Sequence, residues 1–368
     1  MKQFDLIMPC YNEEATLRML ITQKIVPLRK SCGKRFELDL RLIIVDDASK
    51  DNSLNIAKEL AEEFSWIKVL SHSVNRGKGA ALRTGLENST GDYVGIQDAD
   101  DEYNPMNYLE LLEPMVASKA DVVYGSRYLQ RTTRRVLSFW HTLMNRFLTF
   151  VSNMFTGLDI TDMETCYKLF TKKAAHELAL KLKENRFGFE PEITSYVAQG
   201  GYKVYETAIE YNPRTYEEGK KITYKDGIRA LYCILHYGAP YAPFPMQVLL
   251  YTFIGGVSAI LNIISFLILM TLSSSLLLSV SLAFILAAML NYWLCIAILF
   301  KHKAFWSGKE ELFMYILTLL IMGVLDYALT YSFIFVGCSS GWAKLISIII
   351  SFAGNFLLRK YLVFPLKK

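Results

Sequence analysis

The sequence DYVGIQDADD, residues 92–101, joins a short apolar run to a cluster of acidic side chains. The run 92–96 is typical of a buried β-strand, and the acidic cluster begins where that strand would end. Asp98 and Asp100 are one residue apart, so both carboxylates can reach one divalent cation, and such an ion can bridge two phosphates. Taken alone, a DxD pattern is more often a solvated turn. Its position directly after a strand favours a binding site.

Other apolar runs, alternating with helical patterns, also resemble strands. Alternating strands and helices predict an α/β domain built on a mostly parallel sheet that is covered on both faces. Ligands of such sheets bind at the carboxyl ends of the strands. Asp46 and Asp47 follow one run and Arg127 follows another, so we expect their side chains to share a site with Asp98. The runs are 4–8, 38–45, 67–70 and 121–124.

The C-terminal third has a different composition. Apolar residues make up 52% of the chain, and from residue 246 onward they form long segments with few charges. Four segments are long enough to cross roughly 30 Å of hydrocarbon. We therefore expect a globular α/β domain at 1–240 and an all-α transmembrane domain with four spans at 246–366. The predicted spans are 248–270, 276–300, 312–336 and 342–364.

Basic residues predict the orientation of these spans. The positive-inside bias places the basic connection 301–311, the C-terminal tail and the N-terminal domain together in the cytoplasm, and an even number of spans agrees with this. No signal peptide is expected, because the apolar run 4–10 is too short and leads into charged residues. The basic residues counted are Lys301, Lys303, Lys309, Arg359, Lys360, Lys367 and Lys368.

Composition excludes some classes of function. A formal charge of +5 gives no reason to expect binding to nucleic acid. The six cysteines have no metal-binding spacing and are typical of reduced thiols in a protein that faces the cytosol. Assembly into a homo-oligomer is left open by the sequence.

The second and fourth spans end alike. Asn291 precedes Phe300 by the same distance as Asn355 precedes Phe364, which indicates a duplicated pair of two-helix units. This segment resembles the GtrA-like membrane family, which is implicated in the handling of lipid-linked sugars. Both asparagines either hydrogen-bond between helices or contact a substrate. Asp326, inside the third span, is expensive in hydrocarbon and is either functional or held by a structural partner.

Taken together, the motifs of the globular half resemble family 2 glycosyltransferases, in the branch of dolichol-phosphate mannose synthases and bacterial polyprenyl-phosphate glucosyltransferases. The likeness covers about residues 3–230. It implies a Rossmann-like GT-A fold and inverting transfer of a hexose from GDP-mannose or UDP-glucose to dolichyl or undecaprenyl phosphate. The motifs, in the family's order and spacing, are PCYNE at 9–13, VDDAS at 45–49, NRGKG at 75–79, DAD at 98–100 and GSR at 125–127.

The same resemblance implies roles for individual residues. The metal, Mg²⁺ or Mn²⁺, would be held by Asp98, Asp100 and Glu102. The catalytic residues would be Asp98, Asp100, Arg127, Arg214 and Lys220. Relatives often have Ser-Gly-Phe near Tyr167, so the departure here, with Asp162 and Glu164 upstream, leaves the choice of sugar open. The nucleotide-sugar-binding residues would be Pro9, Tyr11, Asn12, Glu13, Val45, Asp46, Asp47, Lys78, Asp98, Ala99, Asp100 and Glu190.

Residues 136–155 have the apolar spacing of an amphipathic helix that either faces a core or lies at a membrane interface, and the four spans favour the interface. A phosphate acceptor has its second pKa near about 6, so it needs cations more than a general base. The segment 212–230 resembles a flexible acceptor loop. The residues expected to bind the lipid phosphate are Arg127, Arg131, His141, Asn145 and Arg146.

The sequence also bears on rival functions. A processive polysaccharide synthase of the family would carry Gln-x-x-Arg-Trp, which this chain lacks. A nucleotidyltransferase would have a glycine-rich loop where this chain has CYNEE, and GKG at 77–79 lacks the remaining residues of a P-loop or dinucleotide fingerprint. A lipid-sugar flippase with a nucleotide-sugar-binding domain, or transfer to another acceptor in cell-surface polysaccharide synthesis, remains the alternative.

Overall fold

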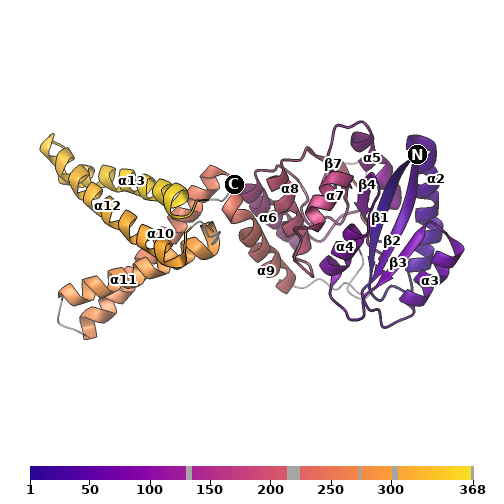
Figure 1. Cartoon of the computed structure of the whole chain (residues 1–368), viewed down its shortest axis with the longest axis horizontal. Helices are drawn as coiled ribbons and strands as arrows, with labels where there is room; N and C mark the ends of the chain where they lie inside the picture. The colour runs from indigo at the N-terminus through magenta and orange to yellow at the C-terminus, as the bar shows by residue number, and fades with distance from the viewer. Residues whose placement is uncertain (130–134, 214–223, 273–275, 301–305, 366–368) are drawn as a thin grey trace. The chain divides into compact units, whose positions relative to one another are not determined.

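The computed structural model (Figure 1) divides the chain into two compact units, Met1–Tyr241 and Ala242–Lys368. Arg131, Arg214 and Lys220 lie outside the described part of the chain. The structure describes residues 1–129, 135–213, 224–272, 276–300 and 306–365.

The first unit contains a seven-stranded sheet with the strand order β3-β2-β1-β4-β6-β5-β7. The predicted α/β architecture is confirmed. The sheet is mixed, however, because β6 runs antiparallel to both β4 and β5. Neither β6 nor β7 was predicted, since β6 is short and β7 is only partly buried. The strands are β1 (Lys2–Cys10), β2 (Leu38–Asp46), β3 (Ile67–Ser71), β4 (Tyr93–Ile96), β5 (Val122–Ser126), β6 (Lys168–Thr171) and β7 (Val204–Ala208).

Helices cover both faces of this sheet, and Figure 1 shows α2 and α4 on opposite sides of β1 and β2. Ile43 and Val45 of β2 pack with Ala81 of α4, which explains why β2 reads as a continuous apolar run. The helical elements of this unit are α1 (Leu17–Leu20), η1 (Ile21–Ile25), α2 (Val26–Phe36), α3 (Ser53–Glu63), α4 (Lys78–Glu87), η2 (Pro105–Asn107), α5 (Tyr108–Val116), α6 (Phe139–Thr156), α7 (Lys172–Ala179), α8 (Phe189–Gly200), α9 (Tyr224–Cys233), η3 (Ile234–Gly238) and η4 (Ala239–Tyr241).

Two predicted segments have different bounds in the structure. The helix expected over 136–155 begins only at Phe139, because the backbone of Ser138 is not helical. The segment 212–230 was expected to be a loop, but its last residues already belong to α9. Ala230 and Cys233 are buried at helical spacing, and this burial favours the helix.

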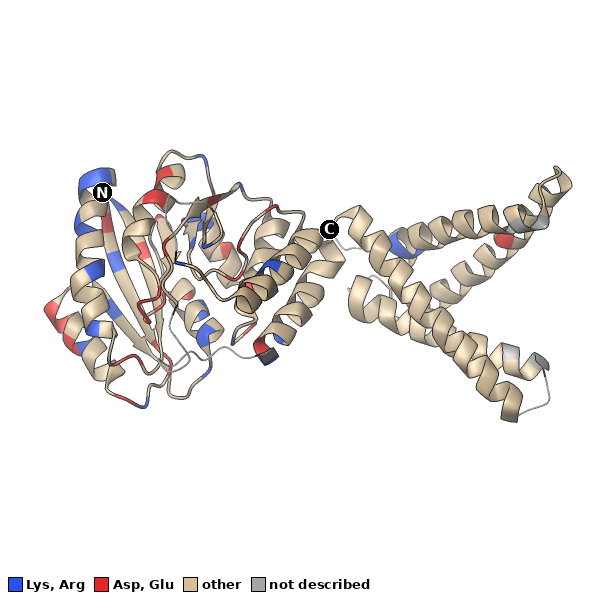
Figure 2. Ribbon diagram, turned by 180° about the vertical axis from the view of Figure 1, so that it is seen from behind, with Lys and Arg blue, Asp and Glu red and all other residues tan. Residues whose placement is uncertain are grey.

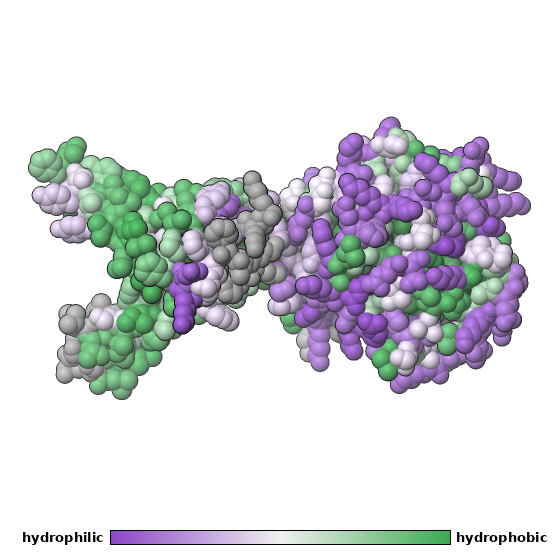
Figure 3. All heavy atoms as spheres, in the orientation of Figure 1, coloured by the Kyte–Doolittle hydropathy of each residue, from purple (hydrophilic) through white to green (hydrophobic). Residues whose placement is uncertain are grey.

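Among its described residues, the second unit contains four helices that are long and apolar enough to cross a membrane, in agreement with the four predicted spans. Charged residues are sparse along these helices (Figure 2), and the face of them seen in Figure 3 is mostly hydrophobic. Within the unit α10 packs on α11, and α12 packs on α13. The elements are α10 (Phe244–Leu272), α11 (Leu276–Leu294), η5 (Cys295–Phe300), α12 (Gly308–Phe335), α13 (Ser340–Leu358) and η6 (Arg359–Val363).

The two helix pairs repeat at an offset of 64 positions, the separation of Cys295 and Arg359. These two residues begin η5 and η6, which are both π-helical. Phe300 and Phe364, at the end of each repeat, stack with ring centroids 5.0 Å apart. The duplication indicated by the sequence thus extends to the backbone. Pairs at the same offset are Tyr251 with Tyr315, Asn291 with Asn355, and Phe300 with Phe364.

Candidate active site

The loops after β1 and β2 form one side of the site. Pro9 of β1 is in register with Val45 of β2, so the motifs 9–13 and 45–49 begin at the same edge of the sheet. The Asn12 N–H donates to Ser49 Oγ at 3.0 Å, and Asn12 Oδ1 accepts from the Lys50 N–H at 2.8 Å. Asn12 is left-handed, with φ of 56°, a conformation that asparagine tolerates. The structure therefore brings the predicted residues 9–13 and 45–49 together.

Adjacent carboxylates in this region have different partners. Asp47 Oδ1 accepts from the Arg76 N–H at 2.9 Å, and Asp47 Oδ2 accepts from the Gly77 N–H at 2.6 Å. Nδ1 of His72 also lies 2.7 Å from Asp47. Asp46 is buried, and its Oδ1 has no hydrogen-bond partner among the described residues. His72 was not predicted, because a single histidine after a strand carries no motif.

Gly77 positions the next helix. Its φ of 96° lies in the left-handed region, and an added Cβ would collide with the backbone of Asn185, so only glycine fits this turn. α4 then begins at Lys78, whose Nζ lies 3.0 Å from Asp98 and 3.4 Å from Glu190. Burial alone would lower the pKa of Lys78, but Asp98 and the other neighbouring groups raise it well above its ordinary value. Lys78 is thus a fixed cation between two carboxylates.

The acidic loop after β4 is held by lysines at Asp98 and Asp101 and by neutral groups between and after them. The Ala99 carbonyl accepts from Thr16 Oγ1 at 2.9 Å, and Asp100 Oδ1 accepts from the Glu102 N–H at 3.2 Å. Glu102 Oε2 accepts from the Tyr211 hydroxyl at 2.8 Å.

Among the residues that the structure describes, no three His, Cys, Asp or Glu side chains are grouped as a metal site. The assignment of Asp98, Asp100 and Glu102 to a metal ion stays a prediction. Asp98 forms an ion pair with Lys78, and Glu102 accepts a hydrogen bond from the Tyr211 hydroxyl.

A second group of buried charges lies beside Glu190. Lys168 is fully buried, and its Nζ donates to the carbonyls of Met163, at 3.1 Å, and Thr165. Burial lowers the pKa of Lys168. Burial and, second, the charge of Glu190 raise the pKa of Glu164 to about 8. Glu164 Oε1 and Glu190 Oε2 have no hydrogen-bond partner in the described chain, an arrangement that demands an explanation such as a ligand hydroxyl.

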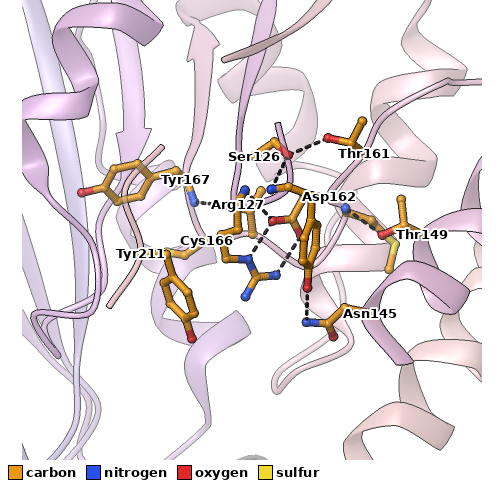
Figure 4. A network of polar contacts seen from close by, with 12 residues as sticks. Ser126, Arg127, Asn145, Thr149, Thr161, Asp162, Cys166, Tyr167 and Tyr211 are labelled. Carbon is orange, nitrogen blue, oxygen red and sulfur yellow. Dashed lines mark hydrogen bonds and ion pairs between the residues drawn. The ribbon is translucent and has the colours of Figure 1, made fainter. Parts of the chain in front are cut away.

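Arg127, directly after β5, is held by Asp162 (Figure 4). Its Nε and Nη2 each donate to a different oxygen of Asp162 at 2.7 Å, and Asp162 is fully buried. The guanidinium also lies over the ring of Tyr211, 5.1 Å from its centroid. This bidentate pair fixes the plane of the arginine, and the guanidinium carries further N–H groups.

Tyr128 connects Arg127 to α6. The guanidinium groups of Arg127 and Arg146 lie 5.7 and 5.5 Å from the centroid of its ring. Its hydroxyl accepts from Asn145 Nδ2 at 3.2 Å, and Asn145 Nδ2 lies 3.5 Å from His141 Nδ1. Four of the five residues expected at the lipid phosphate are therefore neighbours around Tyr128. Tyr128 itself follows the GSR motif directly, and that adjacency is the signal that was available in the sequence.

The amphipathic pattern of α6 is inverted relative to a helix of a soluble protein. Its buried residues include the polar side chains of Asn145, Thr149 and Ser152. Its outward residues are large and apolar, and they recur at helical spacing as one stripe. An exposed apolar stripe of this size is typical of an interaction surface. The stripe, here called the α6 face, consists of Phe139, Trp140, Leu143, Met144, Phe147 and Phe150.

Comparison with protein families finds two matches. The Glycosyl transferase family 2 model matches residues 5–179, which include the strand ends described above up to Arg127. The GtrA/DPMS transmembrane domain model matches residues 250–364, which lie in the four-helix unit.

Curated relatives and solved structures were also compared. A dolichyl-phosphate beta-glucosyltransferase of Trichomonas vaginalis is 28% identical over 56% of this chain and 64% of its own length. A dolichyl-phosphate beta-glucosyltransferase of Homo sapiens is 29% identical over 54% of this chain and 63% of its own length. Each match spans just under two thirds of the relative. The crystal structure of glucosyl-3-phosphoglycerate synthase of Mycobacterium tuberculosis has a TM-score of 0.48 and 17% identity, covering 66% of this chain and 80% of that one. Residues 5–179 are thus similar to family 2 glycosyltransferases and residues 250–364 to GtrA/DPMS transmembrane domains, and the four apolar helices of the described residues support an integral membrane protein.

Proposed function

We propose that this chain transfers a hexose from a nucleotide sugar to the phosphate of a polyprenyl lipid, dolichyl or undecaprenyl phosphate, at the cytoplasmic face of the membrane. The observation that carries the proposal is the two-sided character of α6. On its inner side Asn145 donates to Tyr128, whose ring lies beside the Arg127 guanidinium, and its outer side is apolar. One helix thus contributes to a cationic site, which suits a phosphate, and to a hydrophobic surface. The names of the two relatives make UDP-glucose the first donor to test and GDP-mannose the second.

The donor is held at the ends of β1, β2 and β4. A ribose hydroxyl would supply the partner that Asp46 Oδ1 lacks, while Asp47 fixes the neighbouring turn through Arg76 and Gly77. Lys78 provides a cation for the diphosphate. Hydroxyls of the sugar would satisfy the open oxygens of Glu190 and Glu164. The unpartnered oxygens of Asp46, Glu164 and Glu190 are thereby each assigned to one part of the donor.

The oxygen donors of Asp98 and Asp100 suit Mg²⁺ or Mn²⁺, which prefer carboxylates and take other ligands from phosphates and water. When bound, the ion would neutralise charge that the diphosphate gains as the glycosidic bond breaks. Glu102 would join these ligands by releasing the Tyr211 hydroxyl.

The acceptor requires cations and positioning. Arg127 and Arg146 flank Tyr128 and would bind the lipid phosphate together with Arg131, while the resemblance implies Arg214 and Lys220 as catalytic residues. A phosphate oxygen attacks the anomeric carbon, the nucleoside diphosphate leaves, and the configuration inverts. No general base is needed, because the phosphate is largely dianionic at neutral pH.

The test uses the full-length protein in lipid nanodiscs with polyprenyl phosphate and either UDP-glucose or GDP-mannose. We expect polyprenyl-phosphate hexose, detected by mass spectrometry, from one donor, and no product from neutral polyprenol. Donor binding without any transfer to the lipid phosphate would overturn the proposal. That result would favour the alternative of a lipid-sugar flippase with a nucleotide-sugar-binding domain.

A further inference from the structure

Arg359 lies inside the four-helix unit rather than in a basic tail. The sequence counted it among the tail charges that orient the spans, but it begins η6, within the fourth candidate span, and is only 6% exposed. The sequence contains one indication of this burial: Arg359 is four residues after Asn355 and therefore on the same side of a helix.

Within the described residues, the partners of Arg359 are neutral. Nη1 donates to Asn291 Oδ1 and lies 3.9 Å from Cys295 Sγ, while Nη2 donates to the Tyr315 hydroxyl at 3.2 Å. The guanidinium lies 4.6 Å from the ring centroid of Tyr315 and 5.4 Å from that of Tyr251. Among the described residues no carboxylate is within ion-pair distance of Arg359, and its buried Nε has no hydrogen-bond partner.

The surroundings fix these partners in place. Asn291 Nδ2 donates to Ser258 Oγ of α10 at 3.2 Å, and the Tyr315 hydroxyl lies 3.2 Å from Asn291 Oδ1. The cluster therefore joins α10, α11, α12 and η6, and Asn291 is held at its centre. Neutral dipoles and rings offset part of the cost of burying a cation, but an intramembrane charge without a counter-ion marks a functional site. Its ligand must be an anion.

The depth of the cluster identifies the kind of anion. Tyr251 and Tyr315 are each seven residues from the first residue of their helices, Phe244 and Gly308. At 1.5 Å per residue this is about 10 Å from the helix ends, near the boundary between head groups and hydrocarbon. An anion at that depth is the phosphate of a lipid whose chain lies among the helices.

We propose that Arg359, with Asn291 and Tyr315, binds the phosphate of the polyprenyl lipid, as acceptor or as glycosylated product, at a second site distinct from the one around Tyr128. The inference rests on the proposed function for the identity of the lipid. Both repeats contribute to the site, because Asn291 comes from the first and Tyr315 and Arg359 come from the second.

The experiment labels the full-length protein in nanodiscs with a photoreactive prenyl phosphate and maps the labelled peptides by mass spectrometry. We expect label near α6 and a second set near Asn291 and Arg359. Arg359→Gln should lower the second set at least about tenfold, as expected for the loss of hydrogen bonds to a charged group, and leave the first unchanged. Lys360→Gln is the matched control, because this adjacent cation lies over other rings, those of Phe244 and Phe356, and should change neither set.

A second variant covers the case in which Arg359→Gln fails to fold. Asn291→Asp places a carboxylate against the guanidinium, so the internal ion pair should exclude the lipid phosphate while the thermal midpoint stays equal or rises. Equal labelling of the second set in wild type, Arg359→Gln and Asn291→Asp would overturn the inference. So would labelling that neutral prenol competes away as well as prenyl phosphate does.

Further competitors separate the sources of phosphate. Competition by polyprenyl phosphate but not by phosphatidic acid or inorganic phosphate supports the proposal. Equal competition by phosphatidic acid or by inorganic phosphate overturns it in favour of a general anion site. Failure of the proposed function is a separate result, because it appears as absent sugar transfer by the wild type whatever the labelling pattern.

Discussion

At the scale of single residues, Lys78 determines how the site receives a donor. Its ammonium group lies between Asp98 and Glu190, so the carboxylates do not repel one another in the free protein. A diphosphate would compete for the same cation and release Asp98 for other ligands. The site is thus poised to exchange one set of ion pairs for another.

Asp100 gives the direct test of the acidic loop. Asp100→Asn should lower kcat/KM at least about a hundredfold, because it removes one carboxylate ligand of the ion that would neutralise the leaving diphosphate. Asp101→Asn is the matched control, since Asp101 pairs with Lys24 and has a φ of 59° that asparagine tolerates. Transfer assays on both variants measure the effect. Similar losses in the two, or near-normal turnover by Asp100→Asn, would contradict the assignment.

Glu164 predicts a dependence of stability on pH. Its pKa in the folded protein is about 8, against an ordinary value of 4.5, so the folded state binds the proton more tightly than the unfolded state does. Between those values stability falls as pH rises, and above about 8 the loss is complete. Glu164→Gln removes this loss.

The thermal midpoint of Glu164→Gln should therefore exceed that of the wild type by a margin that grows from about pH 5 to pH 8 and then levels off. Glu87→Gln, at an exposed carboxylate of α4, should show no such trend. A margin that is constant across this range would show that Glu164 does not titrate there.

At the scale of elements, the α6 face predicts contact with lipid. Trp140→Glu should raise the apparent KM for a long-chain polyprenyl phosphate roughly tenfold or more, because a charge opposes insertion at the interface. The kcat on a short, water-soluble prenyl phosphate should stay the same. Leu180→Glu is the matched control, since Leu180 is 76% exposed and Trp140 75%, and only Trp140 belongs to α6. Equal effects of the two variants on KM would remove the interfacial role.

Structural features that depend only on neighbouring residues in the chain could be predicted from the sequence. The strand before Asp98, the acidic loop after it and the four spans follow from local periodicity and spacing. Features created by pairing distant segments could not. β6 enters the sheet between β4 and β5, and Tyr128 gains its importance only when α6 brings Asn145 against it. Arg359 was misplaced for the same reason, because its burial depends on Tyr251 and Tyr315 from other helices.

At the scale of the whole molecule, the basic residues predict that the connection around 301–311 and the C-terminus lie in the cytoplasm. Arg359 no longer contributes to this asymmetry as a surface charge, but Lys309 and Lys360 remain. Reporter fusions active only in the cytoplasm should work at both points, and a fusion between α10 and α11 should not. A reporter that works at the α10–α11 connection but at neither of the other points would reverse the topology.

Each half of the four-helix unit, α10 with α11 and α12 with α13, is a hairpin. Because a hairpin of two spans returns the chain to its starting side, both halves cross the membrane in the same orientation. Such copies meet across a rotation axis, where every side chain near the axis faces its own duplicate. If both repeats had arginine at this position, two like charges would face each other. If both had cysteine, the contact would carry no charge. Cys295 against Arg359 breaks the symmetry at that one contact. At this contact the second repeat therefore presents a cation and the first repeat presents a thiol.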